Sequence, residues 1–145
     1  MKKTNNEQKE YLLLKIKSPN GVDFYSEHKA VIERCGYVDF AKFGNSILKT
    51  ELLNVGDTIF IKESIANGGM LYAATLKEVI KKGKEFPDYY NNLEVANAFW
   101  LRLSDIKIIE NKEYLATYET RAGGAVERAL KSMSPNFYIR KRIKK

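Results

Sequence analysis

The chain has 145 residues, of which 44% are hydrophobic and 30% are charged, a composition that suits one soluble domain with a substantial core. Its net charge of +7 favours a polyanionic partner, namely a nucleic acid, an acidic protein or a membrane surface, although basic tails also serve solubility alone. A single cysteine and a single histidine argue against a disulfide and a zinc site, and no apolar run approaches the roughly 20 residues of a membrane helix.

The first predicted element is a flexible tail over residues 1–9, which is polar and lacks the apolar segment of a secretory signal. Residues 10–145 are expected to form a single domain. Because Cys35 is the lone cysteine, the chain fits a reducing cytoplasm, and we expect no metal, no cofactor and no membrane association.

The first half of the domain is predicted to contain two strands and a helix. An apolar run followed by alternation predicts a strand at 10–18. Ser26 is expected to cap a short helix over 27–35, with Gly36 in the C′ position that follows it. Alternation at 37–43 then predicts a second strand, whose successive side chains face opposite sides of the sheet.

The second half is richer in strands. Two β-rich runs at 58–65 and 70–80 flank a glycine loop and predict an antiparallel hairpin. Five or six strands with two or three short helices indicate a small α+β domain, built on a curled sheet or a partly open β-barrel. The remaining predicted elements are a polar loop at 81–97, strands at 98–109 and 136–143, a candidate additional short strand at 113–119, and a helix at 124–133.

Three stretches follow one another in a familiar order: LLNVGDTIFIKESIANGGMLYAATLKEV, AFWLRLSDIKII and GGAVERALKSMSPNFYI. Together they resemble the PUA-like superfamily, closest to its EVE, YTH and ASCH branches, over about residues 10–140. The resemblance implies a small β-barrel flanked by helices that binds RNA or DNA. EVE and YTH members hold a base, often a modified one, in an aromatic-lined pocket, so the resemblance implies a non-enzymatic nucleic-acid-binding domain.

Aromatic side chains supply candidates for a base site. Tyr37 and Phe43 lie near Lys42 in one predicted strand, and aromatic faces stack on bases while a neighbouring cation holds phosphate. Trp100 is the single tryptophan, and its indole N–H needs a partner if the ring is buried. Packing in the core is the alternative role for these side chains. We predict that a base is held among Tyr37, Phe43, Trp100 and Tyr118.

Phosphate contacts are predicted at a glycine pair. Gly123 and Gly124 precede a helical run, where free N–H groups and the helix dipole favour an anion, although a plain turn has the same sequence. Arg121 stands just before this pair, and Lys62 and Ser64 end a strand where polar groups can read base edges. The full set of predicted nucleic-acid-binding residues is Tyr37, Lys42, Phe43, Lys62, Ser64, Trp100, Tyr118, Arg121, Gly123, Gly124, Arg140, Lys141 and Arg142.

Two other functions stay open. Small amidohydrolases among ASCH relatives use a Lys, Thr and Glu set, and Lys62, Glu63, Thr75 and Glu119 offer such groups for action on a modified nucleoside. No nucleophile elbow, P-loop or metal-ligand pair occurs in the sequence. A basic protein-interaction module is the other alternative. Charge, interleaved aromatic residues and the resemblance together favour nucleic-acid binding.

Overall fold

The structure, a computed structural model, describes residues 9–19, 21–42, 53–64, 69–92, 99–111, 113–131 and 136–142. It is an α+β fold in which seven strands form one sheet. The strands are β1 (Glu10–Ile16), β2 (Val38–Lys42), β3 (Thr58–Glu63), β4 (Leu71–Ile80), β5 (Phe99–Ile109), β6 (Tyr118–Thr120) and β7 (Asn136–Lys141). The α-helices are α1 (Phe24–Cys35) and α2 (Val126–Leu130), and the 3₁₀ helices are η3 (Asp88–Asn92) and η4 (Tyr114–Thr117).

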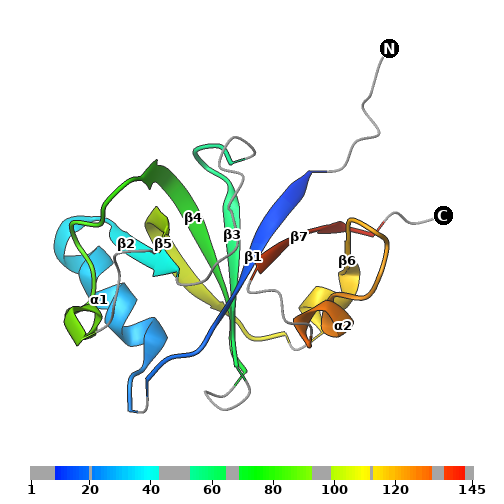
Figure 1. Ribbon diagram of the computed structural model, residues 1–145, viewed down its shortest axis with the longest axis horizontal. Helices are drawn as coiled ribbons and strands as arrows, with labels where there is room; N and C mark the ends of the chain where they lie inside the picture. The colour runs from blue at the N-terminus through cyan, green and yellow to red at the C-terminus, as the bar shows by residue number, and fades with distance from the viewer. Residues whose placement is uncertain are drawn as a thin grey trace.

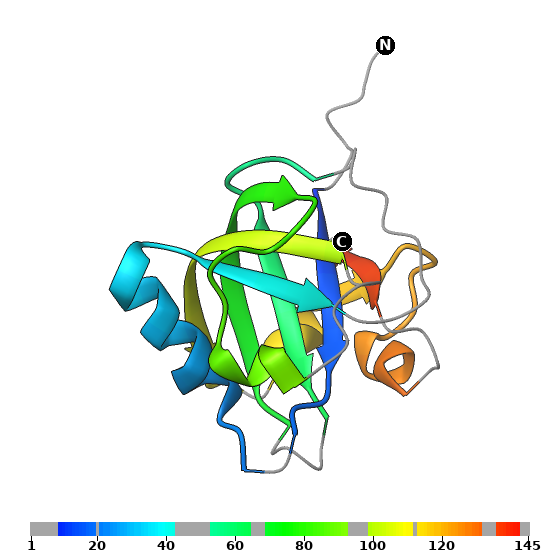
Figure 2. The ribbon, with the colours of Figure 1, turned by 60° about the vertical axis from the view of Figure 1, so that its left-hand side comes forward.

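The sheet has the strand order β2-β5-β4-β3-β1-β7-β6. Neighbouring strands are antiparallel except β1 and β3, which run parallel. Figure 1 shows β2 and β6 on opposite sides of the molecule, and Figure 2 shows the sheet curling without closing. The prediction of an α+β fold on an open sheet is therefore confirmed, including the β3–β4 hairpin.

Seven strands are present among the described residues, more than the five or six that the sequence predicted, because the candidate short strand at 113–119 does contribute a three-residue strand at the edge of the sheet. The segment predicted as one strand at 113–119 divides into η4 and β6. Pairing with β7 and an isolated bridge between Glu119 and Ala125 hold β6 in place. An edge strand this short offers little unpaired backbone to another chain.

Helix α1 begins earlier than the sequence predicted, and Ser26 is not its cap. Asp23 is the N-cap, and its carboxylate accepts a hydrogen bond from the Ser26 backbone N–H at 3.1 Å. A carboxylate in this position satisfies one of the free N–H groups of the first turn. Gly36 ends the helix with φ of 90°, as predicted, and donates its N–H to the Ile32 carbonyl.

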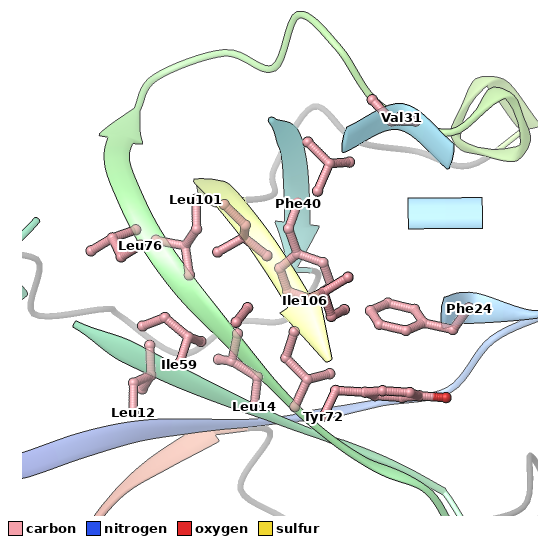
Figure 3. Packing of buried hydrophobic residues seen from close by; sticks show 14 residues of the cluster. Leu12, Leu14, Phe24, Val31, Phe40, Ile59, Tyr72, Leu76, Leu101 and Ile106 are labelled. Atoms are coloured by element: carbon pink, nitrogen blue, oxygen red, sulfur yellow. The ribbon is translucent and has the colours of Figure 1, made fainter. Parts of the chain in front are cut away.

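The core lies on both faces of the central strands. In β1, Leu12 and Leu14 face the larger hydrophobic cluster, which α1 covers through Phe24 and which Figure 3 shows. Leu13 points the other way, into a smaller cluster that includes Leu115 of η4. This burial on both faces explains why β1 reads as an apolar run before it alternates.

Candidate nucleic-acid interface

The sheet order separates the predicted binding residues into two groups. Trp100 is in β5 and Tyr37 directly precedes β2, at one edge of the sheet. Tyr118, Arg121 and Arg140 belong to β6 and β7 or adjoin them, at the other edge (Figure 1). Tyr118 packs in the smaller cluster and Trp100 in a third cluster, so the structure does not bring these two rings together.

Some predictions fall outside the part of the chain that the structure describes. Among them are the tail at 1–8, Phe43, the Lys42 side chain, most of the predicted glycine loop (65–68) and the end of the predicted polar loop (93–97). The end of the predicted helix at 132–133 and the end of the last predicted strand at 143 fall outside it as well. The predicted contacts of Phe43 and Lys42 therefore stay predictions.

The predicted cations at the β6–β7 edge are engaged with carboxylates. Arg121 donates to Glu10 at 2.7 Å, and its guanidinium carbon lies 4.6 Å from the centre of the Tyr138 ring. Arg140 and Arg142 approach the Glu119 carboxylate at 2.8 and 3.9 Å. Partly exposed pairs of this kind contribute about 0–1 kcal/mol, so a phosphate can compete with them. Lys141 is exposed.

The glycine pair closes a turn on Thr120. The Gly123 N–H donates to the Thr120 carbonyl at 2.9 Å, and the Gly124 N–H donates to the Thr120 hydroxyl at 3.1 Å. Gly123 has φ of 88°, a conformation that favours glycine. The helix that follows has only five residues. Both N–H groups thus serve the turn in this structure.

A buried carboxylate lies where β3 ends. Glu63 is 5% exposed and accepts a hydrogen bond from the Tyr72 hydroxyl at 2.5 Å. Burial and this bond raise the pKa of Tyr72, so the phenol stays protonated and donates. Beside it, the Lys62 amine donates to the Gly69 carbonyl and the Ser64 N–H donates to the Ile16 carbonyl.

The residues considered for an amidohydrolase are not gathered around Lys62 and Glu63. Glu119 is in β6, and β1 and β7 separate that strand from β3. Thr75 pairs with Thr58, at the opposite end of β3 from Lys62, about 13 Å away along the strand. The arrangement offers no shared centre for these four side chains.

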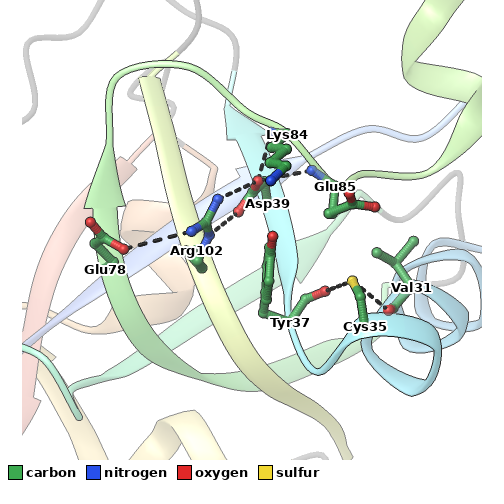
Figure 4. A network of polar contacts seen from close by, with 8 residues as sticks. All are labelled: Val31, Cys35, Tyr37, Asp39, Glu78, Lys84, Glu85 and Arg102. Carbon is green, nitrogen blue, oxygen red and sulfur yellow. Dashed lines mark hydrogen bonds and ion pairs between the residues drawn. The ribbon is translucent and has the colours of Figure 1, made fainter.

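The structure reveals an anchored segment within the predicted polar loop at 81–97. We call residues 81–92 the strap, which continues from β4 past β2 to α1 (Figure 2). Its backbone is tied to β2, because the N–H groups of Lys84 and Glu85 donate to the Asp39 carboxylate at 2.7 and 3.0 Å. The Asp39 N–H donates in return to the Glu85 carbonyl at 2.7 Å. Figure 4 shows this junction.

The side chain of Trp100 packs against the strap. Its side chain packs so closely against Gly83 that a Cβ on that residue would overlap the indole ring. The rings of Phe86 and Tyr90, both in the strap, lie 5.4 and 6.2 Å from the Trp100 ring, centre to centre. Trp100 is 4% exposed. In this structure its large ring packs inside the protein, where it positions the strap.

His28 of α1 forms the second anchor. Its Nδ1 lies 2.9 Å from the Phe24 carbonyl, which can only accept, so Nδ1 carries the proton. Nε2 therefore accepts a hydrogen bond from the Tyr90 hydroxyl at 2.6 Å. Burial lowers the pKa of His28 to about 4, because the protonated ring would lose its hydration. The neutral ring and Tyr90 fix the far end of the strap to α1.

This anchor predicts a pH-dependent stability. The pKa of His28 is about 4 in the folded chain and 6.5 when unperturbed, so the unfolded chain binds the proton first. Stability is complete above pH 6.5 and falls as pH decreases towards 4. We expect a loss of about 1 kcal/mol between pH 7 and 5.5, measured by urea unfolding. His28 is the only histidine. His28→Gln is expected to remove most of this slope, and an equal slope in the variant would contradict the assignment.

Arg102 completes the junction between strap and sheet. Its Nε and Nη2 donate to the two oxygens of Asp39 at 2.7 and 3.1 Å. The guanidinium carbon lies 4.1 Å from the centre of the Tyr37 ring. Nη1 lies 3.7 Å from Glu78, whose side chain is 58% exposed. The hydrogen bond with Asp39 raises the pKa of Arg102, which stays charged.

The strap presents exposed cations. Lys81, Lys82 and Lys84 are all exposed, and none has an ion-pair partner among the described residues. They occur within four consecutive positions on a backbone that Asp39 and Trp100 hold. The signal in the sequence was the KKGK run, which was included in a polar loop. What the structure adds is that the backbone carrying this run is held in place.

Several broad properties can be added for the part of the chain that the structure describes. None of its helices is long and apolar enough to span a membrane. No group of three or more His, Cys, Asp or Glu side chains there could hold a metal ion. Comparison with protein-family models, curated proteins and solved structures gave no match.

Proposed function

We propose that this chain is a non-enzymatic nucleic-acid-binding domain whose principal phosphate contacts come from the strap. The observation that carries the proposal is the placement of Lys81, Lys82 and Lys84 on a backbone fixed by Asp39 and Trp100. Phosphate binding needs exposed cations that can replace the counterions condensed on the nucleic acid. A backbone already held in place adds little ordering cost when the ligand binds.

The net charge of +7 and the resemblance to PUA-like domains of the EVE and ASCH type support the same proposal. A base site on this side of the molecule would use Tyr37, which is half-buried beside the strap junction, rather than Trp100. Arg121, Arg140 and Arg142 would supply a second phosphate contact by exchanging their carboxylate partners. The exposed Cys35 fits a reducing compartment, and we place the function in the cytoplasm.

Titration of labelled single- and double-stranded RNA and DNA at two salt concentrations tests this proposal. We expect binding that weakens steeply with salt, because phosphate contacts release counterions. Substitution of Lys81, Lys82 and Lys84 by Gln is expected to weaken binding at least tenfold. It should also reduce the slope of log K against log salt by about 2, since each lost contact to a single strand removes about 0.7.

A matched control removes the same number of positive charges from surface positions outside the strap. Lys107, Arg128 and Lys131 are exposed and lie outside the strap, so their joint substitution by Gln removes the same formal charge. We expect this control to retain most of the affinity. If both triple variants weaken equally, the contacts are not on the strap. If the wild-type chain binds none of the nucleic acids at low salt, the proposed function is wrong.

A further inference from the structure

The junction beneath the strap holds an arginine in a fixed plane. Asp39 is fully buried, and its two oxygens accept from Nε and Nη2 of Arg102 (Figure 4). A forked contact of this kind fixes both the position and the plane of a guanidinium group. Asp39 also accepts hydrogen bonds from the Lys84 and Glu85 N–H groups. The same carboxylate therefore fixes the position of Arg102 relative to the strap.

The fixed guanidinium lies over an aromatic ring. The Arg102 guanidinium carbon lies 4.1 Å from the centre of the Tyr37 ring, which is stacking distance. The Arg102 side chain is 18% exposed, and Tyr37 is half-buried. Neither group is sealed in the core, in contrast to Trp100 and Tyr118, which are 4% and 3% exposed. Both groups are therefore partly accessible to a ligand from solvent.

We propose that Arg102 and Tyr37 form a stacking platform for an unpaired nucleobase, so that the chain prefers single-stranded over double-stranded nucleic acid. Guanidinium planes and aromatic rings both stack on splayed-out bases, whereas a base inside a duplex has no free face. The strap lysines adjoin the platform through Lys84 and would hold the neighbouring phosphates. This inference rests on the proposed function and specifies its ligand.

Asp39 acts on this platform as a positioning residue. It does not touch the base but orients the Arg102 plane, and no exposed carboxylate could hold that plane as firmly because water would compete for it. Glu78, the other carboxylate near Arg102, is 3.7 Å away and mostly exposed. The orientation of Arg102 thus depends on its buried contact with Asp39 and not on the exposed Glu78.

The test compares a short thymidine oligonucleotide with an abasic oligonucleotide of the same length. Both have the same phosphates, so a difference in affinity measures the contribution of the bases. Stacking of one base predicts about 5- to 150-fold tighter binding of the thymidine strand. Arg102→Lys retains the charge but has no flat surface, and it is expected to remove most of this preference while binding of the abasic strand persists.

A second variant guards against misfolding of the first. Tyr37→Leu keeps an apolar side chain at a half-buried position and removes the ring, so we expect the same loss of base preference with an unchanged unfolding temperature. Tyr138→Leu is the matched control, because Arg121 lies 4.6 Å from the Tyr138 ring in the other arginine–tyrosine pair described. That control is expected to keep the base preference.

The outcomes separate the platform from the proposed function. Equal binding of the thymidine and abasic strands by the wild-type chain overturns the platform and leaves phosphate binding intact. Preference that survives both Arg102→Lys and Tyr37→Leu, or that disappears in Tyr138→Leu alone, overturns it as well. Failure to bind either strand at low salt overturns the proposed function and the platform together.

Discussion

Asp39→Ala is expected to destabilise the fold by about 3–5 kcal/mol, as removal of one member of a buried ion pair does. The Asp39 carboxylate accepts hydrogen bonds from the Lys84 and Glu85 N–H groups and from two nitrogens of Arg102. Its side chain is completely buried, and that of Arg102 is only 18% exposed. Removing the carboxylate leaves two strap N–H groups and a largely buried cation without this acceptor. Urea unfolding at neutral pH measures the loss.

Glu78→Ala provides the control, because it removes the second carboxylate near the same arginine. Glu78 is 58% exposed and lies 3.7 Å from Arg102, so its contribution is expected to be within about 1 kcal/mol. The contrast isolates burial and hydrogen bonding from net charge, since both variants lose one negative charge. A similar cost for the two variants would contradict the central role of Asp39.

The sequence predicted those elements whose pattern is local. The apolar alternation at 58–65 and 70–80, with glycines between, became β3 and β4 in antiparallel register. Gly36 ends α1 as predicted, because this left-handed conformation depends only on the residue itself and its neighbours in the sequence. The cap at the other end of α1 was predicted to be Ser26. Asp23 took the position because the helix extends back to Phe24, which packs into the core.

The candidate site depends on contacts that no local pattern contains. Asp39 and Lys84 are 45 residues apart, and Asp39 and Arg102 are 63 apart. In the sequence, Asp39 is one polar residue in an alternating strand, and Arg102 is one cation in an apolar strand. They come together in the candidate site only when β2 and β5 pair and set Asp39 opposite Arg102.

Aromatic residues were easy to identify in the sequence and hard to assign to a role. Tyr37, Phe43, Trp100 and Tyr118 were predicted to share one base, but the burial of the three described rings (all but Phe43) depends on the order of the strands. Trp100 lies under the strap and Tyr118 packs against Phe60 in the smaller cluster. Tyr37 adjoins the edge strand β2, where a ring can be only half covered. Exposure therefore selects Tyr37 from the three as the candidate for stacking.

These contacts link the proposed binding to stability, because buried anchors outside the strap hold the exposed lysines within it. The anchors Asp39, Trp100 and His28 are buried, while the lysines they position are exposed. A change at an anchor should therefore alter stability and nucleic-acid affinity together. A change at an exposed lysine should alter affinity alone, since exposed substitutions without partners usually cost little stability.

Gly83→Ala tests this division, and we expect it to cost about 1–3 kcal/mol, as overpacking of a well-packed site does. The added Cβ would overlap carbons Cζ3 and Cε3 of Trp100, which is buried and has little room to move. The strap cannot retreat freely, because the next residue, Lys84, is tied to Asp39 through its N–H group. Displacing the strap should also weaken nucleic-acid binding, since the lysines move with it.

Gly124→Ala is the matched control for this substitution. Its added Cβ would lie 3.5 Å from the Thr120 hydroxyl oxygen, an ordinary contact, and the Gly124 N–H would still donate to Thr120. Stability should stay within about 1 kcal/mol of wild type or increase slightly, because alanine restricts the unfolded chain. Thermal and urea unfolding with oligonucleotide titration compare the two variants. If Gly83→Ala left both stability and affinity unchanged, Trp100 would not be holding the strap, and the lysines would have no fixed backbone to present them.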